Sequence, residues 1–169
     1  NDGHCDFYRV LKDYAHQGCR GCGEFPCNLP TNDPRMKGIY RACGKLGWPV
    51  VLDLRFGTTG VIEPTGLPYL EECLREFPET IFVGHGPAWW AEMFADVSLE
   101  EESTAESPDF PVLKPGRVAE LLDRYPNMHA DLSAYSCYRA LTRDLGYARE
   151  SLIRFSHKLL FGTDRFVNG

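Results

Sequence analysis

The chain has 169 residues, of which 43% are hydrophobic and 25% charged, a composition typical of one soluble globular domain. A formal net charge of -6 argues against a nucleic-acid partner, and no apolar run approaches the roughly 18–20 residues that cross a bilayer. Seven cysteines, an odd number placed mostly in apolar runs, favour a reducing, cytoplasmic setting without disulfides.

The N-terminal part is predicted to be a helix followed by a short strand. An apolar stripe from Phe7 to Tyr14 has helical spacing and stops before Gly18, a residue typical of helix ends. Residues 21–25 are small and apolar, which predicts a strand, and residues 26–32 are rich in Pro and Asn, which predicts a loop. Glu24 therefore lies at the end of the first predicted strand.

The next unit begins at Asp33 and Pro34, where the aspartate can cap a helix and proline fits the first helical position. Apolar residues at steps of three and four continue up to Gly47, which closes the predicted helix. Residues 48–52 are apolar and predict a buried strand. This second strand ends at Asp53.

The third strand ends at a histidine. An amphipathic helix over residues 67–77 leads into the apolar run Ile81–Val83, which stops at His85 between two glycines. A single histidine in this position is equally well explained as an ordinary turn residue. Because Glu24 and Asp53 end the preceding strands in the same way, we expect His85 to be functional.

A long loop insertion is predicted over residues 87–116, where the strand–helix alternation is interrupted. Loops of this length within a compact domain are usually functional lids or disordered insertions. Trp89 and Trp90 follow the strand-end histidine closely, which places them to wall a substrate pocket. The alternative is that the two indoles pack the loop onto the rest of the domain.

The C-terminal part resumes the alternation. A helical stripe over residues 118–125 precedes a weakly alternating strand over residues 128–133, which ends near Asp131. A helical region follows, and the apolar run 158–161 predicts a last strand that leads to Asp164. We expect Asp131 to lie in the substrate pocket.

Residues 1–169 are therefore predicted to form a single α/β domain of about five strand–helix units. Such alternation predicts a parallel sheet covered by helices, either an open doubly wound sheet or part of a (β/α)8 barrel. All strand ends converge on one mouth in a barrel, which accounts for the polar residues better than the switch point of an open sheet. A barrel needs about 200 residues or more, so we expect an incomplete chain.

Five segments, taken together and in order, resemble the second part of an amidohydrolase-related metal-dependent hydrolase with a TIM barrel. The branch that they resemble most is the aminocarboxymuconate-semialdehyde decarboxylase-like one, and the chain would supply strands four to eight. These segments are Gly47–Asp53 (GWPVVLD), Pro68–Pro78 (PYLEECLREFP), Ile81–Pro87 (IFVGHGP), Tyr125–Ser133 (YPNMHADLS) and Leu159–Asp164 (LLFGTD).

The resemblance implies a divalent metal at the barrel mouth, zinc in the first place and manganese or iron as alternatives. By position it makes His85 and Asp164 ligands and catalytic residues. Glu24 corresponds to a strand end where some relatives place a carboxylate ligand, and Asp53 stands where the family often has a histidine. The H-x-H ligand pair of strand one is missing from these residues, so this chain alone is expected to be inactive.

The implied reaction is hydrolysis of a C–N, ester or lactone bond, or decarboxylation, of a small-molecule substrate, and the resemblance allows a homodimer. Two alternatives remain open at this point. The chain can be a catalytically degenerate, non-enzymatic barrel relative, as the Asp53 replacement suggests. It can also carry a cysteine-based zinc or redox module at Cys19, Cys22 and Cys27, whose C-x2-C-x4-C spacing lacks a second Cys/His pair.

Overall fold

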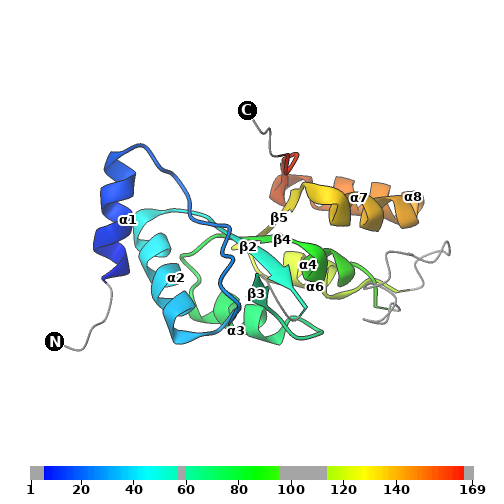
Figure 1. Cartoon of the computed structure of the whole chain (residues 1–169). Coiled ribbons are helices and arrows are strands. Elements are labelled where there is room, and N and C mark those ends of the chain that lie inside the picture. Colours follow the sequence, from blue (N-terminus) through cyan, green and yellow to red (C-terminus); the bar gives the residue numbers. More distant parts are fainter. Residues whose placement is uncertain (1–5, 57–59, 96–113, 166–169) are drawn as a thin grey trace.

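The computed structural model describes residues 6–56, 60–95 and 114–165. In this part of the chain the strands form one parallel sheet in the order β1-β3-β2-β4-β5-β6. Figure 1 shows the sheet in the middle of the molecule, with α1, α2 and α3 toward one end and α4, α6, α7 and α8 toward the other. The strands are β1 (Leu29–Pro30), β2 (Val50–Arg55), β3 (Val61–Ile62), β4 (Phe82–His85), β5 (Met128–Leu132) and β6 (Leu159–Phe161). The helices are α1 (Phe7–His16), α2 (Pro34–Leu46), α3 (Pro68–Glu76), α4 (Pro87–Ala91), α6 (Arg117–Arg124), α7 (Ala134–Arg143) and α8 (Leu145–Arg154), with a 3-10 turn η1 (Ser156–Lys158).

The order of the long strands is that of an arc of a barrel. β2, β4, β5 and β6 are neighbours in chain order, and Cys22 forms a parallel bridge with Val50 at the start of β2. Consecutive parallel strands that neighbour one another without a reversal are the arrangement of a (β/α)8 barrel, whereas a doubly wound sheet changes direction at a switch point. The described strands therefore form a partial barrel.

Four of the five predicted strands are present as β2, β4, β5 and β6, and the first prediction needs correction. Residues 21–25 form only the isolated bridge at Cys22. The segment predicted to be a loop over residues 26–32 contains β1, which pairs with β3 (Val61–Ile62) in register with the end of β2. Each of these two strands has two residues, too few for a sequence pattern to reveal.

Local sequence sets the helix ends as predicted. The side chain of Asp33 accepts a hydrogen bond from the Arg35 amide at 2.9 Å, with Pro34 at the first position of α2. Gly47 ends this helix at φ 66°, in the left-handed region that glycine adopts without strain. None of the described helices is both long and apolar enough to cross a membrane.

The predicted loop insertion over residues 87–116 is a loop only in part. It begins with the short helix α4, and its base is closed by an antiparallel bridge between Phe94 and Pro115. The Gly116 amide also donates to the Met93 carbonyl at 3.0 Å. Residues 96–113 of the predicted insertion lie outside the described residues.

One face of β2 packs in the hydrophobic core, and the other face carries the candidate site. Val50, Leu52 and Leu54 are fully buried and belong to the hydrophobic core. Because side chains alternate along a strand, Asp53 and Arg55 lie on the opposite face, and Asp53 is in register with His85 of β4. The face that carries no core residues of β2 is therefore the face that carries the candidate site.

A buried carboxyl group anchors α3. Glu63 is 1% exposed and accepts hydrogen bonds from the Thr31 hydroxyl and from the amides of Tyr69 (2.8 Å) and Leu70 (3.2 Å) in the first turn of the helix. Burial raises the pKa of Glu63 to about 7, and these hydrogen bonds oppose the rise only in part. Glu63 thus replaces an N-cap side chain, which Leu67 cannot provide.

This raised pKa predicts that Glu63 makes the complete protein less stable as the pH rises from about 4.5 to about 7. In this window the unfolded chain releases the proton that the folded state retains, so the free energy of unfolding falls, by up to about 3 kcal/mol. Chemical denaturation at several pH values should show a smaller fall in Glu63→Gln than in the wild type. Glu79→Gln, at an exposed position, is the control; equal pH slopes in all three proteins would refute the prediction.

Candidate metal centre

His85 is the most deeply buried residue of the candidate site. It ends β4, is 2% exposed, and lies in register with Asp53 of β2. Its Nδ1 is 2.9 Å from Asp131 Oδ1, and its Nε2 is 3.5 Å from Glu24 Oε1. One nitrogen of the His85 ring therefore contacts the carboxylate of Asp131, and the other faces the carboxylate of Glu24.

The structure brings together Glu24, His85 and Asp164, three of the four residues that were predicted as metal ligands. One ligand atom from each residue lies within 4.8 Å of the other two. Glu24 follows the Cys22 bridge and Asp164 follows β6, so the three side chains come from separate strand ends and are far apart in sequence. Among the described residues, no other three His, Cys, Asp or Glu side chains come together in this way.

The electrostatics of this cluster favour a positive charge. Burial raises the pKa of Glu24, and Asp53, Asp164 and Asp131 raise it further, while His85 opposes the rise. Burial acts to lower the pKa of His85, but the hydrogen bond that His85 donates to Asp131 and the charges of the nearby carboxylates outweigh it, so the pKa of His85 is raised. Both raised pKa values mean that the site binds a proton readily. A bound cation would provide the same positive charge.

Asp53 was predicted as a fourth metal ligand, and the structure gives it another partner. Both of its carboxylate oxygens lie 2.9 Å from Arg55 Nε, and Asp53 is not among the three converging residues. A carboxylate in an ion pair is a weaker candidate ligand, because binding a metal would compete with the guanidinium. Arg55 is a site residue that the sequence analysis missed, although it follows Asp53 by two residues on the same strand face.

Asp131 was predicted to lie in the substrate pocket, and it lies behind His85. Besides its contact with Nδ1, its Oδ2 accepts a hydrogen bond from the Ser133 hydroxyl at 2.8 Å. Ser133 Oγ is also 3.2 Å from His85 Nδ1. Carboxylates that hold the second nitrogen of a ligand histidine are common around metal sites, so this position fits a supporting role better than contact with substrate.

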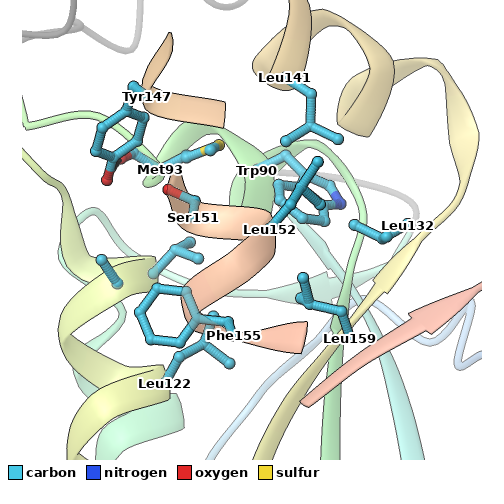
Figure 2. A pocket seen from close by; sticks show the side chains of 12 residues that line it. Trp90, Met93, Leu122, Leu132, Leu141, Tyr147, Ser151, Leu152, Phe155 and Leu159 are labelled. Atoms are coloured by element: carbon cyan, nitrogen blue, oxygen red, sulfur yellow. Dashed lines mark hydrogen bonds between the residues drawn. The ribbon is translucent and has the colours of Figure 1, made fainter. Parts of the chain in front are cut away.

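Trp89 and Trp90 do not wall the mouth of the site. They are 0% and 3% exposed and belong to the hydrophobic core, where the ring of Trp89 packs against Gly84. Trp90 lines an apolar cavity of about 20 Å³, a volume about the size that one water molecule needs. Figure 2 shows this cavity between Trp90, Leu141, Leu152 and Phe155. The alternative interpretation, that the tryptophans fix this segment onto the domain, agrees with their burial.

The three cysteines of the C-x2-C-x4-C run do not form a site in the described part of the chain. Cys19 is exposed, and Cys22 and Cys27 are half-buried. The thiol of Cys27 lies 3.9 Å from the sulfur of Met36, and the thiol of Cys22 interacts with that of Cys43. The cysteine-based zinc module therefore has no geometric support.

Comparison with known proteins gives the family of the chain. The family model described as "Amidohydrolase" matches residues 16–169, and the chain belongs to this amidohydrolase family. This match confirms the predicted family, and the order of the described parallel strands confirms the predicted partial (β/α)8 barrel. Comparison with curated proteins gives no match.

Three solved structures similar to the chain are decarboxylases. A 5-carboxyvanillate decarboxylase from Sphingomonas paucimobilis is 16% identical with a TM-score of 0.48, over 93% of this chain and 51% of that one. A 2,6-dihydroxybenzoate decarboxylase from Rhizobium is 14% identical with a TM-score of 0.46, over 94% and 55%. A dihydroxybenzoic acid decarboxylase from Polaromonas sp., with bound manganese and the inhibitor 2-nitroresorcinol, is 12% identical with a TM-score of 0.46, over 93% and 54%. The chain thus spans about half the length of these proteins.

Proposed function

We propose that the complete protein is a metal-dependent amidohydrolase-family enzyme that hydrolyses or decarboxylates a small molecule. The observation that carries this proposal is the convergence of Glu24, His85 and Asp164 on one point at the strand ends. Two carboxylates and an imidazole are a donor set that suits zinc, and also manganese or iron. The remaining ligands would come from the other half of a complete barrel, and a cytoplasmic location remains an expectation from the cysteine content.

The residues present fit such a metal on physical grounds. Glu24 Oε1 and His85 Nε2 are 3.5 Å apart, and both are acceptors when the imidazole is neutral and its proton lies on Nδ1. Two lone pairs that face each other repel unless a proton or a cation lies between them. Burial and the neighbouring aspartates raise the pKa of Glu24, and the hydrogen bond to Asp131 with the nearby carboxylates raises the pKa of His85 against its burial. A divalent cation would be held at this point by Glu24, His85 and Asp164.

A bound divalent cation would supply a polarised substrate oxygen or a water molecule with a pKa near ~7. Asp164 is an exposed member of the cluster and adopts φ 53°, a left-handed conformation that Asp tolerates better than most residues. We assign it the proton transfer, because its carboxylate can take a proton from an attacking water and return it to the leaving group. His85, fixed by Asp131, would hold the cation through Nε2, next to the oxygen on which negative charge develops.

The same residues serve both reactions in the proposal. In hydrolysis, water adds to a carbonyl carbon, the C–N or C–O bond breaks, and the proton from water goes to the leaving nitrogen or oxygen. In decarboxylation, the C–C bond to the carboxylate breaks, carbon dioxide leaves, and the substrate carbon takes a proton from the protonated Asp164. Each reaction needs one group that changes its protonation state at the mouth, and Asp164 provides it.

Metal analysis of the complete protein separates this proposal from its two rivals. We expect about one equivalent of zinc or manganese that is lost in His85→Ala and retained in Cys22→Ser. The reverse pattern would instead support the cysteine-based module. A folded protein without metal would support a catalytically degenerate relative, an alternative that the Asp53–Arg55 ion pair at a usual ligand position keeps open.

A further inference from the structure

We propose that Asp131 and Ser133 are positioning residues that hold His85 in the tautomer with its proton on Nδ1, so that Nε2 faces Glu24 and Asp164. This inference rests on the proposed function only where it concerns metal binding. It assigns Ser133 a role that the sequence pattern did not predict. It also replaces the predicted pocket role of Asp131.

Counting hydrogens assigns the tautomer. An ionised carboxylate has no hydrogen to donate, so the 2.8 Å contact between Ser133 Oγ and Asp131 Oδ2 uses the hydroxyl hydrogen. Ser133 Oγ can then only accept from His85 Nδ1, 3.2 Å away. Asp131 Oδ1, at 2.9 Å from Nδ1, also accepts. Both partners of Nδ1 accept, so Nδ1 carries the proton and the neutral ring presents the lone pair of Nε2.

Ser133 gives up an ordinary helix cap to make these contacts. It occupies the N-cap position of α7, where serine commonly accepts a bond from the helix amides, yet its side chain makes no such bond within the described residues. The N-caps of α1, α2 and α8, namely Asp6, Asp33 and Asp144, all make one. The hydroxyl of Ser133 is directed to the His85–Asp131 pair instead.

The backbone next to Ser133 adopts an uncommon conformation. Ala134, the first residue of α7, has φ 65°, a conformation that a non-glycine residue adopts at a cost. Gly162 packs against the side chain of Ser133, because a Cβ on this glycine would lie 3.2 Å from Ser133 Cβ. Gly162 precedes Asp164 by two residues, so the turn that carries Asp164 lies against the residue that fixes His85.

The direct test is the tautomer of His85 in the complete, metal-free protein, read from its 15N chemical shifts at an alkaline pH where the ring is neutral. We expect the Nδ1–H form in the wild type and in Ser133→Thr, which keeps the hydroxyl. In Ser133→Ala and Asp131→Asn we expect the Nε2–H form to become populated. Zinc should also bind about 10- to 100-fold more weakly in these two variants.

Ser136→Ala is the matched control, because Ser136 lies in the first turn of the same helix and its buried hydroxyl has no hydrogen-bond partner in the described part of the chain. It should change neither the tautomer nor the zinc affinity. An Nε2–H form in the wild type would overturn the inference, as would an unchanged tautomer in both Ser133→Ala and Asp131→Asn. A wild type with the Nδ1–H form that binds no zinc would support the positioning role and refute the proposed function.

Discussion

Asp164→Ala in the complete protein is expected to weaken metal binding by more than about 100-fold and to abolish measurable turnover. Loss of a residue that only supports a ligand costs about 10- to 100-fold in affinity or activity, and Asp164 is placed to be a ligand itself. It is also the group to which we assign the proton transfer. Metal titration followed by inductively coupled plasma analysis would measure the loss of metal affinity. Product formation from a panel of carboxylate, amide and lactone substrates would measure the loss of turnover.

Asp123→Ala is the appropriate control for this substitution. Asp123 is also a partly exposed aspartate, but it pairs with Arg154 at 2.5 Å on the surface, where such a pair contributes about 0–1 kcal/mol to stability. It should retain full metal affinity and activity. Retention of metal and turnover by Asp164→Ala would show that the residue is not part of the centre.

Gly86→Ala is expected to lower the free energy of unfolding by about 3 kcal/mol or more, the largest effect on stability that the site region offers. Gly86 has φ 90°, and a Cβ at this position would lie 2.3 Å from Asp53 Oδ1 and 2.8 Å from the carbonyl oxygen of Leu54. Backbone strain of this kind costs about 1–3 kcal/mol and overpacking about 1–3 kcal/mol more. Equilibrium denaturation of the complete protein measures the sum.

Gly66→Ala separates the two contributions. Gly66 has a similar φ of 84°, but a Cβ there would meet nothing within 4 Å, so this variant should show the backbone strain alone. The difference between the two variants then gives the cost of the clash with Asp53 and Leu54. If both variants lose the same free energy of unfolding, the clash at Gly86 contributes nothing. The backbone around Gly86 would then move away from Asp53 without loss of stability.

The local patterns of the sequence were sufficient for most of the fold. The Asp33 cap, the Gly47 helix end and the long buried strands were predictable because each depends on residues close in sequence. The two-residue strands β1 and β3 were not, because they exist only through pairing with each other and with the end of β2. Residues 21–25 have strand-like composition, but they pair only at Cys22.

The candidate site was predictable to the extent that strand ends meet at one edge. Glu24 follows the Cys22 bridge, His85 ends β4 and Asp164 follows β6. Parallel strands bring their carboxyl ends together whatever their distance in sequence. The roles of Asp53 and Asp131 were not predictable in this way. They depend on which side chain lies next to each carboxylate, Arg55 in one case and His85 with Ser133 in the other.

Trp89 and Trp90 show a further limit of predicting a site from the sequence. Trp89 and Trp90 follow the site histidine closely, but α4 turns them into the core, where Trp89 covers Gly84 and Trp90 faces α6 and α8. Proximity in sequence to a catalytic residue does not determine the direction of a side chain in a helix, since successive residues point about 100° apart. Only the placement of the helix decides which residues reach the mouth.

The most direct test of the proposed metal centre is anomalous diffraction from crystals of the complete protein grown with zinc or manganese. The account predicts one strong anomalous peak within about 2.0–2.3 Å of a carboxylate oxygen of Glu24, a carboxylate oxygen of Asp164 and Nε2 of His85. A peak at Cys19, Cys22 and Cys27, or metal-replete crystals without a peak between Glu24, His85 and Asp164, would contradict it.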